Sequence, residues 1–227
     1  MKNHLKRIAS PKTWFVDRKV NTFIVRPNPG AHSLDNGLPL GVLLRDDLEL
    51  ASTMGEIKKM LNNKEVLVDG IRRKDHSFMV GLFDVLSLPE LKKYYRMVLD
   101  KKGRLTLKEV SAQESTLKLA KVVGKTMMKG SKVQFNLHDG RNILSDGKAN
   151  VGDTFVLTLP KASVKKILPL KNGAKIFLTK GKHAGDLGVL KAVKGNEATY
   201  SAAGADVETA KAYLFVVGEK DTEIKLD

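Results

Sequence analysis

Residues 53–75 read TMGEIKKMLNNKEVLVDGIRRKD, a pattern typical of a short helix followed by a β-hairpin. Thr53 and Glu56 have the T-x-x-E form of a capping box, in which both side chains bind backbone N–H groups at the start of a helix. Apolar residues at positions 57, 60 and 61 then give the helix one apolar side. Asp69-Gly70 is a turn signal between two short strands. We therefore expect a helix that begins after Thr53 and a hairpin that turns at Asp69-Gly70.

The same stretch is rich in cations. Lys58 and Lys59 lie on the expected polar side of the helix, and Arg72, Arg73 and Lys74 follow the turn directly. An arginine fork binds phosphate through two parallel hydrogen bonds, which lysine cannot do. The helix and the hairpin can therefore present several cations on one face, at the spacing of phosphates in a nucleic acid.

The pattern changes on either side of this stretch. Residues 1–37 read as an extended basic arm, because the prolines of RPNPG at 26–30 disfavour a helix. Apolar residues near a helical stripe predict a helix over 41–51. Beyond residue 95, short alternating runs separated by glycine-containing turns predict strands, and their spacing suggests small barrels. We therefore expect an α+β, multi-domain and mostly β fold, with a boundary between Pro160 and Pro169.

The charge balance narrows the function. Forty Lys and Arg against 25 Asp and Glu give a net charge of +15 over 227 residues. Such a field attracts polyanions, and neutralisation of phosphates with release of counterions is its usual use. The surplus is spread over the arm and two central segments, whereas a membrane-surface protein more often carries one basic amphipathic helix. We therefore expect a nucleic acid as the partner.

Several function classes lack their residues. Cysteine is absent, which excludes disulfides, thiolate metal sites and a cysteine nucleophile, and fits a reducing compartment. No apolar run approaches the ~18 residues of a membrane span. Gly124-Lys125-Thr126 resembles the end of a P-loop, but Leu119 stands where its first glycine belongs. We expect no cofactor, no metal, no membrane and no small-molecule substrate, and a cytoplasmic location.

One near match concerns RNA-modifying enzymes. Gly103-Arg104-Leu105-Thr106 is similar to the GRLD motif of pseudouridine synthases, in which the aspartate does the chemistry. Thr106 cannot act as that carboxylate. An RNA-modifying enzyme of this type is therefore an alternative that lacks its central residue.

Two segments resemble known RNA-binding modules. The helix and hairpin, with residues 84–87, resemble the S-four-type RNA-binding domain, and GAKIFLTKGKHAGDLGVL at 173–190 resembles a KOW motif. The glycines at 181 and 185 of that motif allow positive φ and a close approach of RNA to the loop backbone. Five stretches occur in order, with the KOW-like segment behind them: HLKRIASPKTW (4–14), LPLGVLLRDDL (38–48), the hairpin VDGIRRKD (68–75), YRMVLDKKGRL (95–105) and NLHDGRNI (136–143). Together they look like the archaeal and eukaryotic S-four-e family of small-subunit ribosomal proteins, over essentially the whole chain.

The resemblance implies four parts. They are a basic extended arm (1–37), an S-four-like RNA-binding domain (38–95), a central β domain (96–169) and a KOW-bearing, SH3-like barrel (170–227). It also implies a non-catalytic constituent of the small ribosomal subunit, in the cytoplasm. Such a protein binds and stabilises folded small-subunit ribosomal RNA beside neighbouring ribosomal proteins. A KOW-containing transcription factor that binds polymerase is a further alternative.

Charge and resemblance together predict the RNA contacts. The candidate residues are Lys2, Lys6, Arg7, Lys12, Trp14, Arg26, Arg45, Lys58, Lys59, Lys64, Arg72, Arg73, Lys74, Lys101, Lys102, Arg104, His138, Arg141, Asn142, Lys180, Lys182 and His183. Trp14, Phe15 and Phe23 either anchor the arm onto the body or stack on bases. The nearly neutral segment 171–227 leaves open whether the barrel faces RNA, protein or solvent.

Overall fold

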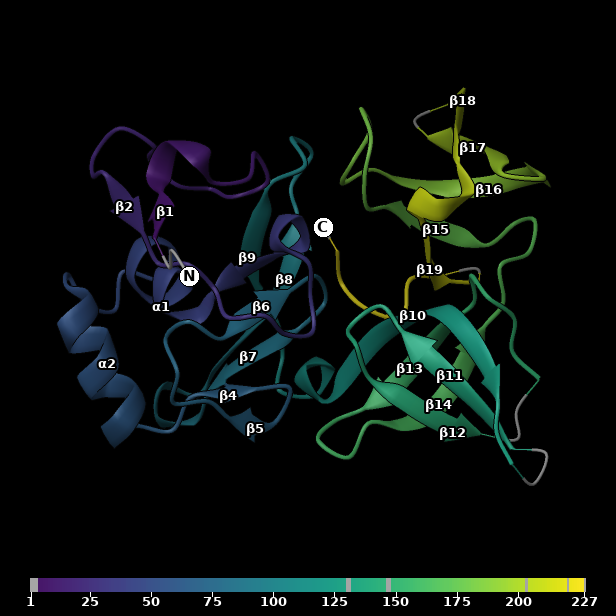
Figure 1. The fold of residues 1–227 in the computed structure, drawn as a ribbon. Coiled ribbons are helices and arrows are strands. Elements are labelled where there is room, and N and C mark those ends of the chain that lie inside the picture. Colours follow the sequence, from purple (N-terminus) through teal and green to yellow (C-terminus); the bar gives the residue numbers. More distant parts are fainter. Residues whose placement is uncertain (1–3, 130–131, 146–147, 203, 220, 227) are drawn as a thin grey trace. The chain divides into compact units, whose positions relative to one another are not determined.

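The computed structural model describes residues 4–129, 132–145, 148–202, 204–219 and 221–226. Most of the secondary structure is β, in several sheets, with few helices, so the predicted mostly β architecture is confirmed. The chain divides into two compact units, Met1–Val98 with Arg104–Ser115 (unit 1) and Leu99–Gly103 with Thr116–Asp227 (unit 2) (Figure 1). Among the described residues, no helix has the length and apolar character needed to cross a membrane.

The N-terminal segment of unit 1 is held by a buried tryptophan and a small sheet. β1 (Leu5–Lys6) pairs antiparallel with β2 (Phe23–Ile24), and the short 3₁₀ turns η1 (Arg7–Ala9) and η2 (Leu34–Asn36) lie in the same segment. Trp14 is 2% exposed, and its indole N–H donates to the carbonyl oxygen of Leu34 at 3.1 Å. Of the two roles considered for Trp14, anchoring is the one that its burial supports.

The helices of unit 1 begin close to the predicted positions, but the one predicted over 41–51 ends at Asp47. α1 (Leu40–Val42) continues into the π-helical turn η3 (Leu43–Asp47), and α2 (Met54–Asn63) follows. The Thr53 hydroxyl accepts the N–H of Glu56 at 3.3 Å, and the Glu56 carboxylate accepts the N–H of Thr53 at 3.2 Å. The predicted capping box is therefore confirmed, because it satisfies donors that the first helical turn leaves without partners.

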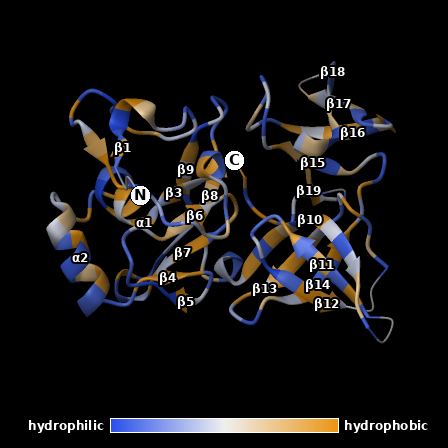
Figure 2. Ribbon diagram, viewed as in Figure 1, coloured by the Kyte–Doolittle hydropathy of each residue, from blue (hydrophilic) through white to orange (hydrophobic). Residues whose placement is uncertain are grey.

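A five-stranded sheet and a two-stranded sheet complete unit 1. The larger has the order β5-β4-β7-β8-β9, with β4 (Leu67–Val68), β5 (Ile71–Arg72), β7 (Val85–Leu88), β8 (Lys93–Leu99) and β9 (Leu105–Glu109). The smaller pairs β3 (Gly37–Pro39) with β6 (Met79–Gly81), and the turn η4 (Pro89–Leu91) follows β7. Positive φ at both Asp69 (53°) and Gly70 (76°) confirms the predicted hairpin turn. Figure 2 shows apolar residues gathered in strands such as β7, while α2 is mostly hydrophilic.

Unit 2 contains two antiparallel five-stranded sheets. The first has the order β12-β11-β10-β13-β14, built from β10 (Leu117–Met127), β11 (Val133–Leu137), β12 (Asn142–Ser145), β13 (Thr154–Thr158) and β14 (Ser163–Leu168) after the turn η5 (Glu114–Thr116). Its core includes Phe135, Phe155 and Leu157, all buried. Gly124-Lys125-Thr126 lies inside β10, paired with β11, so these residues form no phosphate-binding loop.

The second sheet of unit 2 has the order β18-β17-β16-β15-β19. It is built from β15 (Lys175–Leu178), β16 (Leu187–Lys194), β17 (Glu197–Ala202), β18 (Ala205–Ala210) and β19 (Leu214–Gly218), with the turn η6 (Lys211–Tyr213) before β19. Lys121 of β10 links the two sheets, because its ammonium donates to the carbonyl oxygens of Ala212 at 2.8 Å and Leu214 at 2.6 Å. Burial and the nearby charge of Lys211 lower the pKa of Lys121 to about 8.

Candidate nucleic-acid interface

The helix and the hairpin of unit 1 are joined by one arginine. The guanidinium of Arg72 donates to the carbonyl oxygen of Asn62 at 3.0 Å and to that of Lys64 at 3.4 Å, at the C-terminal end of α2. A cation there satisfies helix carbonyls that have no partner within the helix. The hairpin is thereby tied to α2, whose exposed side carries Lys58 and Lys59. The helix and hairpin cations predicted from the sequence thus belong to one connected structure.

Three other cations of this region are partly engaged within the protein. Arg73 is half-buried, and its guanidinium lies 4.2 Å from the ring centroid of Phe78. The ammonium of Lys64 lies 3.1 Å from a carboxylate oxygen of Glu90. Arg45 pairs with Asp46, and that hydrogen bond raises the pKa of Arg45 above its ordinary value. These three residues therefore offer RNA less free charge than Lys58, Lys59 and Lys74.

Two of the predicted contact residues of the arm have structural roles. Arg7 is 5% exposed, pairs with Asp46 at 3.3 Å, and donates from Nε to the carbonyl oxygen of Asp17. Trp14 is buried as described above. A side chain with so little exposed surface cannot stack on a base or bind several phosphate oxygens. We therefore leave Arg7 and Trp14 out of the interface.

Other predicted residues of the arm are exposed. Lys6, Lys12 and Arg26 have exposed side chains. Lys6 and Lys12 make no ion pair with any residue in the part of the chain that the structure describes. Lys2 lies outside the described residues.

Two loops of unit 2 bring four predicted lysines together. A Cβ at Gly185, in the loop after β15, would lie only 2.2 Å from the carbonyl oxygen of Asp100, in the loop after β8. Gly103 of that loop likewise faces Ala184, at 3.2 Å for an added Cβ. The exposed lysines that these touching loops carry are Lys101, Lys102, Lys180 and Lys182. Gly185 is thus required by the protein's own backbone, which fills the space that we expected RNA to approach.

The remaining predicted cations near these loops are less free. His183 is half-buried, with its Nδ1 at 3.3 Å from a carboxylate oxygen of Asp186. In unit 1, the half-buried guanidinium of Arg104 lies 5.7 Å from the ring centroid of Phe15.

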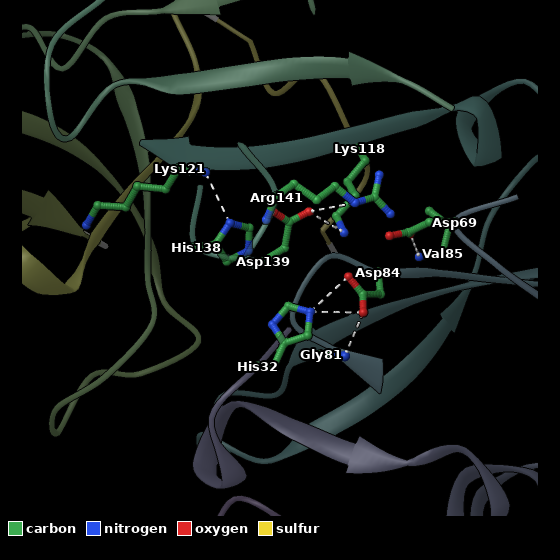
Figure 3. A network of polar contacts seen from close by, with 10 residues as sticks. All are labelled: His32, Asp69, Gly81, Asp84, Val85, Lys118, Lys121, His138, Asp139 and Arg141. Carbon is green, nitrogen blue, oxygen red and sulfur yellow. Dashed lines mark hydrogen bonds and ion pairs between the residues drawn. The ribbon is translucent and has the colours of Figure 1, made fainter. Parts of the chain in front are cut away.

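The turn that follows β11 is built on a buried ion pair that the sequence analysis missed. The ammonium of Lys118 lies 2.9 Å from a carboxylate oxygen of Asp139, and both side chains are 1% exposed (Figure 3). Burial is the largest single effect and opposes ionisation of Asp139. The charges of Lys118, His138 and Arg141, with the hydrogen bond from Lys118, together outweigh it and hold the pKa of Asp139 below its ordinary value. The only sequence signal was a lysine at an inward-facing position of an apolar strand.

The predicted contact residues of this turn differ in exposure. The ring of His138 packs edge-on against Phe215 at 5.2 Å, and its Nδ1 accepts the backbone N–H of Lys121 at 3.2 Å. Arg141 is half-buried, 3.5 Å from Asp139. Asn142 is exposed. His138 is therefore a packing residue, and Arg141 and Asn142 are the members of the turn that RNA can reach.

A buried histidine–carboxylate pair in unit 1 belongs to the packing. Nε2 of His32 lies 3.0 and 3.2 Å from the two oxygens of Asp84, which also accepts the N–H of Gly81 at 2.8 Å (Figure 3). A Cβ at Gly81 would overlap the His32 ring, at 2.2 Å. No group of three or more His, Cys, Asp or Glu that could hold a metal occurs among the described residues. The candidate interface therefore consists of the exposed basic residues described above, and the pair of His32 and Asp84 is not part of it.

Comparison with known proteins gives consistent matches. Residues 91–164 match the model of ribosomal family S4e, and residues 1–35 match that of the RS4NT domain. Small ribosomal subunit protein eS4 of Archaeoglobus fulgidus is 42% identical over 226 residues, covering 97% of this chain and 95% of that protein. The protein of the same name from Nanoarchaeum equitans is 42% identical over 194 residues, covering 85% and 83%.

A solved structure matches as well. The crystal structure of the 30S ribosomal protein S4e from Thermoplasma acidophilum has a TM-score of 0.72 and 28% sequence identity, and the match covers 82% of this chain and 96% of that one. The names of these three proteins are those of ribosomal proteins, and none of them names an enzyme.

Proposed function

This chain belongs to the S4e family of ribosomal proteins, which is the S-four-e family that its sequence resembles, and on that premise we propose that it is a structural constituent of the small ribosomal subunit. There it binds and stabilises folded small-subunit ribosomal RNA beside neighbouring ribosomal proteins, in the cytoplasm, and catalyses no reaction. The names of the relatives support assembly into the small ribosomal subunit, and the surface chemistry of this chain supports RNA binding.

The observation that carries the proposal is a set of exposed lysines that face solvent without carboxylate partners. Among the residues that the structure describes, no ion pair joins an acidic group to Lys58, Lys59, Lys74, Lys101, Lys102, Lys180 or Lys182. An exposed lysine without a partner keeps its full charge for an external anion, and each phosphate that it neutralises releases counterions. A folded RNA is a polyanion whose phosphates can contact several of these groups of lysines at once.

The proposed division of labour follows the four parts predicted from the sequence. α2 and the β4–β5 hairpin support the S-four-like domain at 38–95, and β8 and β9 extend its sheet beyond residue 95. The sheet of β10–β14 supports the central domain at 96–169, and the sheet of β15–β19 supports the KOW-bearing barrel at 170–227. The arm at 1–37 contributes exposed cations beside its buried anchor. The proposed contacts are Lys6, Lys12, Arg26, Lys58, Lys59, Arg72, Lys74, Lys101, Lys102, Asn142, Lys180 and Lys182, with Arg45, Lys64, Arg73, Arg104, Arg141 and His183 in supporting positions.

Co-sedimentation tests the proposed assembly. A tagged copy of the full chain, expressed in its own cells, should remain with small ribosomal subunits through a gradient after a moderate-salt wash. Co-purification with RNA polymerase and absence from the subunits would instead support a KOW-containing transcription factor. Turnover above background in an isotope-release assay on RNA transcripts would support the RNA-modifying enzyme.

A further inference from the structure

Two aromatic rings of the N-terminal segment remain exposed where a third is buried. Trp14 is 2% exposed, whereas Phe15 and Phe23 are 54% and 53% exposed. An exposed phenylalanine ring gains much when another flat or apolar group covers it. The three aromatic residues therefore differ in role. Trp14 anchors, and the two phenylalanines are available to a partner.

The register of the small sheet places a cation beside Phe23. Lys6 of β1 pairs with Phe23 of β2, and Leu5 pairs with Ile24. Cross-strand partners point to the same face of a sheet, and successive residues alternate between faces. Ile24 is 7% exposed and turns inward, so Phe23 and Lys6 turn outward together. The His4 ring lies 5.4 Å from that of Phe23, inclined by 46°.

We infer that Phe23 and Lys6 form a stacking site for an unpaired RNA base, with Lys6 binding an adjacent phosphate. Aromatic side chains hold splayed-out bases in single-stranded RNA, because every base has a π face. Phe15 beside the Arg104 guanidinium offers the same pairing of an exposed ring with a cation. The inference rests on the proposed function and adds to it a contact with a base, which phosphate-binding lysines do not make.

The charge of the segment favours RNA over a protein as the occupant. Residues 4–26 contain Lys6, Arg7, Lys12, Arg18, Lys19 and Arg26 against the single acidic residue Asp17. Such a segment attracts phosphates and repels a basic protein. The exposed aliphatic residues Ile8 (70%) and Val20 (67%) are the features that would suit a protein instead. Ile8 is therefore the matched control, because it is exposed and apolar but has no π face.

Affinity measured at several salt concentrations separates stacking from charge. The full chain and its variants are bound to a folded transcript of the Archaeoglobus fulgidus small-subunit ribosomal RNA. Phe23→Ala should lower the affinity at fixed salt about 5- to 150-fold, the range expected for the loss of one stacked base. It should leave the slope of log affinity against log salt unchanged, because no phosphate contact is lost. Lys6→Gln should reduce that slope by about 0.7–0.9, and Ile8→Ala should change neither quantity.

Fluorescence provides a direct readout of the stacking. Trp14 is the only tryptophan of the chain and is buried, so it is shielded from bound bases. Phe23→Trp should retain the affinity, and its tryptophan fluorescence should fall when the transcript binds. The fluorescence of Ile8→Trp should not fall.

The outcomes separate the two proposals. If the wild-type chain binds with steep salt dependence but Phe23→Ala binds equally well and Phe23→Trp is not quenched, the stacking site is overturned and the proposed function stands. Equal losses in Ile8→Ala and Phe23→Ala would also overturn it, because they indicate a general apolar surface that a protein covers. If the wild-type chain does not bind the transcript, the proposed function itself fails.

Discussion

The buried pair of Lys118 and Asp139 makes a quantitative prediction about stability. Lys118→Met replaces the ammonium with an apolar group of similar length and leaves the Asp139 carboxylate buried. Removing one partner of a buried ion pair costs about 3–5 kcal/mol, because the remaining charge is no longer compensated. Arg141 stays 3.5 Å from Asp139, and its backbone N–H donates to the carboxylate at 3.2 Å. We therefore expect the lower end, about 3 kcal/mol.

Urea unfolding followed by far-UV circular dichroism measures this loss. Asp139→Asn added to Lys118→Met removes the uncompensated charge and keeps an oxygen that can accept the Arg141 N–H. The double variant should therefore be more stable than Lys118→Met, and it should be less destabilised than the sum of the two single variants by on the order of 2 kcal/mol, a coupling typical of contacting groups. A loss below about 1 kcal/mol in Lys118→Met, or a double variant as unstable as the sum of the single ones, would refute the reasoning.

Three further predictions follow from single contacts. In a filter-binding assay, the double variant Lys58→Gln with Lys59→Gln should reduce the slope of log RNA affinity against log salt by about 1.4–1.8. Lys191→Gln is the control, because it removes an exposed lysine that pairs with Asp206 at 2.7 Å, and it should leave the slope unchanged. Gly185→Ala should lower the free energy of unfolding by at least about 2 kcal/mol, because the φ of Gly185 is 92° and an added Cβ would meet Asp100. Gly173→Ala, where φ is 87° but the space is open, should lower it by about 1 kcal/mol in the same chemical unfolding experiment. The pKa of Lys121 is lowered to about 8 in the folded chain, so between pH 8 and about 10.5 the unfolded chain binds a proton at Lys121 that the folded chain has lost. The stability of the wild-type chain relative to Lys121→Met should therefore rise by on the order of 1–3 kcal/mol between these pH values. Urea unfolding at each pH measures this change.

Local chemistry explains what the sequence predicted well. The capping box of Thr53 and Glu56 and the turn at Asp69-Gly70 depend on neighbours within four residues, so their signals are complete in the sequence. The strands followed from alternation of apolar residues, which reflects one buried face. The exclusion of a P-loop at Gly124-Lys125-Thr126 rested on the same local logic.

Long-range contacts explain what the sequence could not predict. Arg7 and Lys6 are adjacent cations of one basic arm. The positions of Asp46 and of the Asp17 carbonyl make Arg7 an internal partner, while Lys6 stays exposed. Gly185 appeared suited to an RNA contact, but Asp100, distant in the sequence, fills the space beside it. The pairing of Lys118 with Asp139 depends on which strands are neighbours, and alternation alone does not give that order.

The salt dependence of RNA binding by the unmodified chain tests the central claim most directly. If about eight phosphates are neutralised by the exposed lysines and arginines, log affinity for the small-subunit ribosomal RNA should fall against log salt with a slope of roughly −6 to −7. An affinity that does not change with salt would contradict the account, because distributed cations would then contribute nothing to binding.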